Sequence, residues 1–213
     1  MIDVLRAVQR CYDEVADTYA DHFPSTEPEQ PVDLAMIAHF AALLGEGRRV
    51  LDAGCGAGRM MPLLAGLGCE VRGVDLSPGM VRRGRVDHPE FDIEVASLID
   101  LPFGDGEVDG VFAWYSTIHT PDAGLPGVLA ELGRVLRHDG LLLLAFQTGH
   151  GVREVGAGFR QRGHDVQLDR YHRSAADIAR MLGDGDFRVV ATLDRGPVGA
   201  EADGQAVVIA RKR

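Results

Sequence analysis

Lysine is almost absent from this chain: Lys212, next to the C-terminal residue, is the only one among 213 residues. The three cysteines, Cys11, Cys55 and Cys69, are scattered and form no Cys-x-x-Cys pair. This spacing argues against a disulfide framework or a zinc site, and it favours a reducing, cytoplasmic location. No apolar run approaches the ~20 residues that cross a bilayer, and the first residues lack a basic segment followed by an apolar one. Neither a membrane span nor a signal peptide is therefore expected.

Positive charge is also scarce, since 22 arginine and lysine residues stand against 32 aspartate and glutamate residues, for a net charge of −10. Phosphate backbones and anionic lipid surfaces attract a basic face, so neither a nucleic acid nor a membrane is expected as a partner. The eight histidines show no His-x-x-His or carboxylate cluster with metal-site spacing, and no metal is expected. Length and composition fit one globular domain. We expect a monomer or a homodimer.

What the chain does contain is a glycine-rich turn at Gly54, Gly56 and Gly58. The turn follows an apolar run at residues 49–53 and precedes a helical pattern at residues 59–67. A buried strand that leads through a glycine turn into a helix is where a parallel α/β sheet binds a nucleotide-like ligand. The spacing is Gly-x-Gly-x-Gly, whereas the fingerprint that serves a dinucleotide pyrophosphate is Gly-x-Gly-x-x-Gly. The spacing disfavours a dinucleotide, and a tight turn without any ligand is the alternative.

Strand and helix patterns alternate after this point, which is typical of βαβ units and a parallel sheet. Residues 141–146 form a continuous apolar run, typical of a central strand buried on both faces. The last two strands have no helix between them, so we expect them to pair antiparallel as an edge hairpin. The predicted strands are 49–53, 70–74, 91–95, 108–114, 141–146, 187–193 and 206–210, and the predicted helices are 12–20, 34–44, 59–67, 77–86, 125–137 and 174–182.

Several motifs, taken together and in order, resemble those of the class I S-adenosylmethionine-dependent methyltransferases that act on small molecules. The segment Tyr12–Tyr19 resembles the Tyr-Asp-x-x-Ala-x-x-Tyr helix of the N-terminal lid in that family. The other matches are Val50–Gly58 to the first motif, Val74–Met80 to the second, Asp100–Phe103 and Val108–Val111 to the segment around the fourth strand, and Leu132–Leu142 to the approach to the fifth.

This resemblance implies a Rossmann-like α/β fold with a seven-stranded, mostly parallel sheet of order 3-2-1-4-5-7-6, whose last strand is antiparallel, with helices on both faces. It implies one domain over residues 1–213, with a helical lid at 1–46, the core at 47–213 and an acceptor-side insertion at 147–173. The implied enzyme moves a methyl group from S-adenosylmethionine to a hydroxyl, amine or other nucleophile of a small-molecule acceptor, and leaves S-adenosylhomocysteine.

The same resemblance assigns the glycine turn to the cofactor. Gly54, Cys55, Gly56 and Gly58 would let the backbone pass close to the methionine and ribose portions. Asp75 ends the second predicted strand, where a carboxylate can accept hydrogen bonds from both ribose hydroxyls. The alternative for Asp75 is an acid that only caps the next helix.

Further cofactor contacts follow from the resemblance. Asp52 would help to hold the methionine ammonium and Tyr19 the carboxylate, unless they are a strand-end acid and an ordinary helix tyrosine. Ser97 stands where the family has an acid that accepts a hydrogen bond from the adenine amine, and a serine accepts such a bond more weakly. The residues expected to form apolar walls for adenine, or else plain core, are Leu76, Met80 and Leu98.

Candidate catalytic residues follow the fourth predicted strand. His119 is the candidate base for a hydroxyl acceptor, because phenols have a pKa of about 10, or it fixes the loop through a backbone hydrogen bond. Tyr115, the second catalytic candidate, and Trp114, which we count among the cofactor contacts, could stack on adenine or on an aromatic acceptor, or pack in the core. A sulfonium is already an activated methyl donor, so alignment of the reactants can supply much of the rate. Residues 147–173 are expected to cover the acceptor.

Two other functions stay open. A nicotinamide-dependent oxidoreductase is disfavoured by the glycine spacing and by the absence of a Tyr-x-x-x-Lys pair, since Lys212 lies in the C-terminal tail. A noncatalytic module that binds S-adenosylmethionine has the same sequence features as the enzyme.

Overall fold

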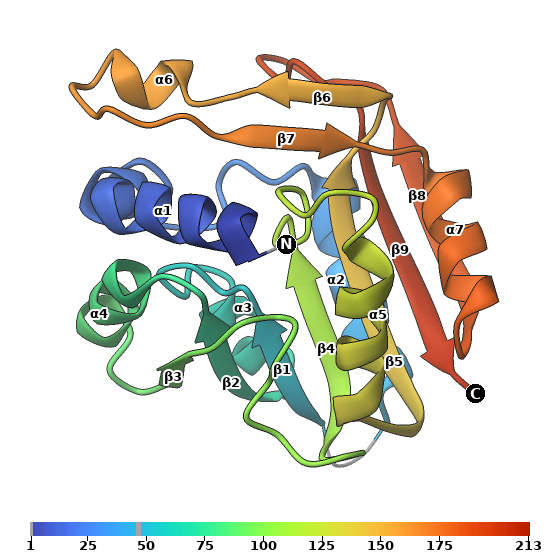
Figure 1. The fold of residues 1–213 in the computed structure, drawn as a ribbon. Coiled ribbons are helices and arrows are strands. Elements are labelled where there is room, and N and C mark those ends of the chain that lie inside the picture. Colours follow the sequence, from blue (N-terminus) through green and yellow to red (C-terminus); the bar gives the residue numbers. More distant parts are fainter. Residues whose placement is uncertain (1, 46–47) are drawn as a thin grey trace.

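A seven-stranded sheet forms the centre of the protein, in a computed structural model that describes residues 2–45 and 48–213 (Figure 1). The strand order is β3-β2-β1-β4-β5-β9-β8, in which the first five strands are parallel and β9 is antiparallel to both of its neighbours. The strands are β1 (Arg49–Ala53), β2 (Glu70–Asp75), β3 (Asp92–Val95), β4 (Val108–Trp114), β5 (Leu136–Gln147), β8 (Phe187–Arg195) and β9 (Gln205–Lys212). This topology confirms the predicted sheet order and the edge hairpin.

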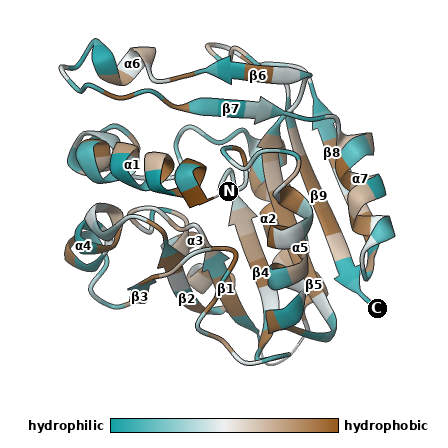
Figure 2. Ribbon diagram, viewed as in Figure 1, coloured by the Kyte–Doolittle hydropathy of each residue, from teal (hydrophilic) through white to brown (hydrophobic). Residues whose placement is uncertain are grey.

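Helices cover both faces of the sheet because its central strands are apolar on both sides. Along β5, Leu142 and Leu144 pack with α5 and α7, whereas Leu141 and Leu143 pack with α2 and α3. Hydrophobic residues accordingly concentrate along β4, β5 and β9 (Figure 2). The helices are α1 (Ile2–His22), α2 (Pro31–Leu43), α3 (Met61–Gly66), α4 (Pro78–Asp87), α5 (Leu125–Val135), α6 (Ala157–Arg160) and α7 (Ala175–Asp184). None of the described helices is both long enough and apolar enough to span a membrane.

The predicted helix starts at Ser77 and Ser174 are confirmed. The Ser77 side chain accepts a hydrogen bond from the backbone N–H of Met80, and the Ser174 side chain accepts one from that of Asp177. Each serine thereby satisfies a backbone donor that the first helical turn leaves unpaired.

The predicted helix over 125–137 is wrong at its end. The helix stops at Val135, and Leu136 already pairs with Val108 as the first residue of β5. The register then shifts, and Asp139, at φ +62°, and Gly140 form an irregularity within the strand. The Asp-Gly turn signal is therefore real, but it marks a bend inside β5 and does not end a helix.

Residues 147–173 contain a small two-stranded ribbon that the sequence did not indicate. Strands β6 (Gly151–Glu154) and β7 (Asp169–His172) pair antiparallel, with α6 between them. The ribbon runs alongside α1, above the ends to which the parallel strands point (Figure 1). Val166 and Leu168 pack against Cys11 and Val15 of α1. The predicted boundary between lid and core, at residues 46 and 47, lies outside the described residues.

Candidate functional site

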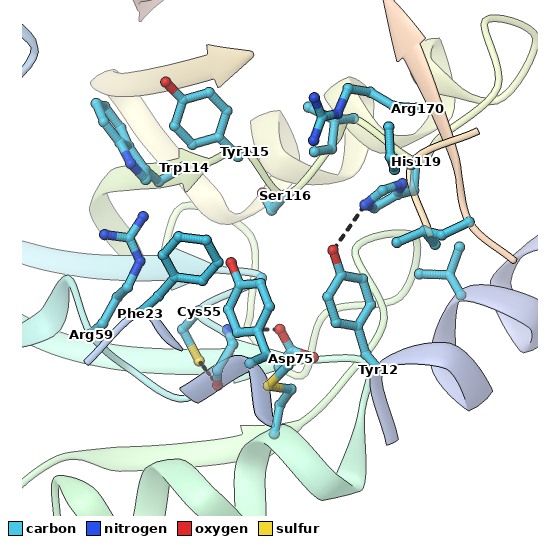
Figure 3. Close-up of a pocket in the computed structure, with 18 of the residues that line it drawn as sticks. Tyr12, Phe23, Cys55, Arg59, Asp75, Trp114, Tyr115, Ser116, His119 and Arg170 are labelled. Carbon is cyan, nitrogen blue, oxygen red and sulfur yellow. Dashed lines mark hydrogen bonds between the residues drawn. The ribbon is translucent and has the colours of Figure 1, made fainter. Parts of the chain in front are cut away.

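A cavity of about 800 Å³ lies where the parallel strands end, between the sheet, α1 and the β6–β7 ribbon (Figure 3). It contains most of the side chains and turns that the sequence singled out. The predicted site residues that line it are Tyr19, Asp52, Gly54, Cys55, Gly56, Asp75, Leu76, Met80, Ser97, Leu98, Trp114, Tyr115 and His119. Gly58 is the one predicted site residue that does not line it, and its cofactor contact stays a prediction.

The three glycines of the turn have three different surroundings. Gly54, at φ +81°, lies so close to the loop after β4 that an added Cβ would overlap the Cβ of Ser116. Gly56, at φ +57°, lines the cavity, and a Cβ there would meet no atom within 4 Å. Gly58, at φ +83°, faces His88 and Ile93, 3.2 Å from an added Cβ. Only Gly56 therefore uses its missing side chain to keep the cavity open.

Two carboxylates lie beside this turn, Asp52 buried and Asp75 partly exposed. The Oδ2 of Asp75 accepts a hydrogen bond from the N–H of Gly56 at 2.8 Å, and its Oδ1 accepts one from the N–H of Ser77 at 2.9 Å. Asp52 is 1% exposed, and its Oδ2 has no hydrogen-bond partner among the described residues. Burial, together with the negative charge of Asp75, raises the pKa of Asp52 to about 8. A cation bound next to Asp52 would relieve this cost.

Helix α1 reaches the candidate base through a hydrogen bond. The Nδ1 of His119 lies 2.6 Å from the carbonyl oxygen of Asp169, which can only accept, so Nδ1 carries the proton. The unprotonated Nε2 then accepts from the hydroxyl of Tyr12 at 2.9 Å (Figure 3). Burial lowers the pKa of His119 to about 4, against the opposing effect of the Asp169 hydrogen bond. His119 is thus neutral at pH 7 and already engaged on both nitrogens.

Aromatic side chains form the wall next to the end of β4. Tyr115 adopts φ +56°, a conformation that a non-glycine residue rarely takes, and its ring meets that of Trp114 edge-on with centroids 5.3 Å apart. Trp114 in turn stacks on Phe112 at 5.4 Å, and its buried Nε1–H has no partner in the described part of the chain. The turn at Tyr115 brings Ser116 against Gly54 and leads the chain toward His119.

The cavity residues that sequence reasoning missed include Arg59, Tyr12, Arg170 and Gln205. Arg59 follows the last glycine and pairs through Nη2 with Glu29 Oε1 at 2.6 Å. Tyr12 lies seven residues before Tyr19, a spacing that places both on one helix face, and this signal was available. Arg170 and Gln205 come from β7 and β9, and no local pattern marks them. Within residues 2–45 and 48–213, no group of three or more His, Cys, Asp or Glu side chains is placed to hold a metal ion.

The family model described as "Methyltransferase domain" matches residues 50–140. A malonyl-[acyl-carrier protein] O-methyltransferase of Erwinia pyrifoliae is 29% identical over 166 residues, which are 78% of this chain and 61% of the relative. A probable S-adenosylmethionine-dependent methyltransferase of Mycolicibacterium smegmatis is 31% identical over 150 residues, 69% of this chain and 54% of the relative. The chain thus spans little more than half the length of these two relatives.

Solved structures of methyltransferases have a similar fold. Magnesium protoporphyrin IX methyltransferase from Synechocystis, with bound S-adenosylhomocysteine, has a TM-score of 0.71 at 21% identity, over 97% of this chain and 98% of that one. A 1,6-didemethyltoxoflavin-N1-methyltransferase from Burkholderia thailandensis has a TM-score of 0.71 at 20% identity, over 99% and 89%. The family model and the curated relatives thus show that residues 50–140 belong to the methyltransferase-domain family and are similar to S-adenosylmethionine-dependent methyltransferases, and the solved structures show that the chain has the class I methyltransferase fold.

Proposed function

We propose that this chain binds S-adenosylmethionine in the described cavity and transfers its methyl group to a small molecule. The observation that supports this best is the buried, unpartnered Oδ2 of Asp52 beside the open space at Gly56. The cofactor carries an ammonium and a sulfonium, and both cations suit a cavity wall with two carboxylates, of which Asp52 is buried.

Each chemical group of the cofactor has a proposed partner among the residues that line the cavity. Asp52 would take the ammonium, and Asp75 the ribose hydroxyls. Arg59 would bind the carboxylate of the cofactor, because among the cavity arginines it is the nearest in sequence to the glycine turn. Tyr19 would lie beside the same carboxylate. The pKa of Tyr19 is shifted mainly by burial and also by the charge of Arg59, so the two side chains are close to each other. The apolar side chains proposed for the adenine are Leu76, Met80 and Leu98, with Ser97 at its amine.

Bound S-adenosylmethionine supplies an activated methyl group, so the protein has mainly to align the acceptor and exclude water. The neutral Nε2 of His119 would accept a proton directly or through the hydroxyl of Tyr12. With a pKa of about 4, however, His119 is a weak base for a phenol or alcohol. The site therefore favours an acceptor whose attacking atom needs no deprotonation, or one that loses its proton easily. Residues 147–173 and α1 would cover this acceptor.

The cofactor site is tested by a pair of glycine substitutions. In Gly56→Ala the added methyl group enters the cavity, and we expect the affinity for S-adenosylhomocysteine to fall at least about tenfold, which is ~1.4 kcal/mol. Gly151→Ala is the matched control, because Gly151 also has a positive φ (+78°) and open space around it but does not line the cavity. Calorimetry should show the control binding as tightly as the wild type. Equal affinities in Gly56→Ala and the wild type would contradict the assignment.

A further inference from the structure

A set of unpartnered polar atoms lines the cavity, contributed by β5, β7, β9 and the loop after β4. These atoms are buried, and no described residue offers them a hydrogen bond; they are Arg170 Nε, Gln147 Oε1, Gln205 Oε1 and Ser116 Oγ. All four residues line the cavity. A buried polar atom without a partner costs on the order of 1–3 kcal/mol, so a ligand that satisfies these atoms gains that much. None of them has a role in the cofactor contacts proposed above.

Arg170 offers two hydrogen-bond donors in a fixed geometry. Its Nη1 donates to Oδ2 of Asp203 at 3.1 Å, which anchors one side of the guanidinium. The unpartnered Nε–H lies on the other side, on the edge that it shares with Nη2. That edge binds a carboxylate through two parallel hydrogen bonds.

The charges around Asp203 do not balance. Its carboxylate contacts the guanidinium groups of both Arg153 and Arg170 and lies 3.3 Å from His172 Nε2. One negative charge thus faces two permanent positive charges, and an anion next to Arg170 would complete the balance. Arg153 is 46% exposed and does not line the cavity, so of these two guanidinium groups only that of Arg170 faces a cavity ligand.

Arg170 is close to the pair formed by Tyr12 and His119. Burial is the largest cause of the pKa shifts of both residues, and the positive charge of Arg170 acts on each of them as well. In the view of Figure 3 its guanidinium lies between Tyr115 and His119. An anion on Arg170 would therefore lie where the acceptor is expected, at the end of β4.

Gln205 adds a hydrogen-bond acceptor of fixed orientation. The Nε2 of Gln205 donates to the backbone carbonyl oxygen of Asp203 at 3.0 Å. Because a carbonyl oxygen can only accept, the amide nitrogen of Gln205 must face Asp203, and Oε1 faces away from it. The residue is 7% exposed, and this Oε1 can only be satisfied by a donor. Because Arg170 and Gln205 are both anchored on Asp203, a ligand can meet both at once.

We propose that the acceptor is a small carboxylic acid whose carboxylate binds the Nε–Nη2 edge of Arg170, with a neighbouring hydroxyl or amine that donates to Gln205. This inference rests on the proposed methyl transfer, since it concerns the molecule that receives the methyl group. A carboxylate is ionised above a pH of about 4, so it matches the positive charge at neutral pH. An amide of the same shape keeps the size but loses the charge and one acceptor oxygen.

The test compares acids with their own amides on the full chain saturated with S-adenosylhomocysteine. The probes are benzoate, 2-hydroxybenzoate, malonate and hexanoate, each beside its amide, and ligand-observed NMR measures their dissociation constants. We expect the wild type to bind at least one acid about tenfold or more tighter than its amide. Arg170→Gln should reduce that preference to less than about threefold. Arg170→Lys, which keeps the charge but loses the two-donor edge, should give an intermediate preference and covers the case in which Arg170→Gln does not fold.

Arg153→Gln is the matched control, because Arg153 contacts the same Asp203 from outside the cavity and its loss should leave the preference for the acid unchanged. The proposal is overturned if no acid is preferred over its amide, or if the preference survives in the Arg170 variants. Calorimetry with S-adenosylhomocysteine tests the proposed function separately. A wild type that does not bind it overturns that function, whereas normal binding without any acid preference overturns only the carboxylate proposal.

Discussion

At the scale of single residues, Asp52 is the side chain whose chemistry its surroundings change most clearly. It lies at the end of a buried strand, with one carboxylate oxygen unpartnered among the described residues. An ionised carboxylate in such a place destabilises the folded chain unless a cation compensates it. The raised pKa of Asp52, about 8, is the measurable consequence of that position.

Asp52→Asn should therefore change how stability depends on pH. In the unfolded chain Asp52 ionises near its ordinary pKa of 3.8, and in the folded chain near 8, so the wild type without ligand loses stability as pH rises between these values. Asparagine does not ionise. We expect the difference in the free energy of unfolding, variant minus wild type, to increase by about 3 kcal/mol from pH 5 to pH 8.

Urea denaturation of both proteins at the two pH values, without cofactor, measures this difference. The comparison within each protein cancels any loss of packing that asparagine causes, because such a loss does not depend on pH. A difference between wild type and variant that is the same at pH 5 and pH 8 would show that Asp52 is not destabilised by its charge.

The same residues show how far sequence reasoning reaches at this scale. The turn pattern predicted that glycines were required at 54, 56 and 58, and all three do have positive φ. It could not predict that one faces Ser116, one faces the cavity and one faces Ile93, because these neighbours come from distant strands and loops. Arg170 was missed for the same reason, since only the return of β7 toward β4 brings it to the cavity.

At the scale of elements, α1 is the part of the predicted lid whose anchoring is best defined. On one side, Asp13 Oδ1 accepts hydrogen bonds from Ser77 Oγ at 2.6 Å and from the N–H of Gly79 at 2.9 Å, at the start of α4. On the other side, Glu14 accepts one from the N–H of Asp165 at 2.8 Å, in the segment that links α6 to β7. Helix α1 therefore joins the cofactor side of the sheet to the β6–β7 ribbon.

Two aspartates of α1 allow this anchoring to be tested. Asp13→Ala leaves a backbone donor and a hydroxyl of α4 without their partner, and we expect a loss of about 1–3 kcal/mol in the docking of α1. Asp17→Ala removes an ion pair with Arg82, but Asp17 is 62% exposed, and exposed pairs contribute about 0–1 kcal/mol.

Limited trypsin digestion after Arg6 and Arg10 reports how often α1 leaves the sheet. Cleavage should be faster in Asp13→Ala than in the wild type, and nearly unchanged in Asp17→Ala. Because Tyr12 and Tyr19 of α1 line the cavity, Asp13→Ala should also bind S-adenosylhomocysteine more weakly. Equal cleavage rates for the two variants would show that Asp13 does not anchor the helix.

The elements themselves divide into those that a local pattern determines and those that it does not. The five parallel strands are apolar runs between helical patterns, and the predicted strands all appear in the sheet within a few residues. The β6–β7 ribbon was not predicted because its strands are four residues long, mostly polar and without a buried residue, so they show no apolar alternation. Its position depends on packing against α1, which is a contact distant in sequence.

At the scale of the whole molecule, the fold places the two proposed ligands on two parts of one sheet edge. The ends of β1 and β2, with Asp52 and Asp75, form the part proposed for the cofactor. The ends of β5 and β9, with Gln147 and Gln205, form the part proposed for the acceptor. The antiparallel β9 makes this possible, because it begins at the edge where β5 ends and so brings its first residue, Gln205, to the cavity.

This arrangement predicts where a bound cofactor protects the backbone from hydrogen exchange. A ligand that binds only the folded chain stabilises it by ~2.7 kcal/mol at a concentration 100 times its dissociation constant, and every region that exchanges by global unfolding slows accordingly. Regions that exchange by local opening slow only where the ligand holds them. We expect additional protection from S-adenosylhomocysteine in α1 and in the turn after β1, and no additional protection in α7 and β8, which lie away from the cavity at the far edge of the sheet.

Exchange measured by mass spectrometry resolves these segments, and protection confined to α7 and β8 would place the cofactor elsewhere. The Gly56→Ala variant provides the control, because at the same ligand concentration its weaker binding should reduce the protection of α1 and of the turn together.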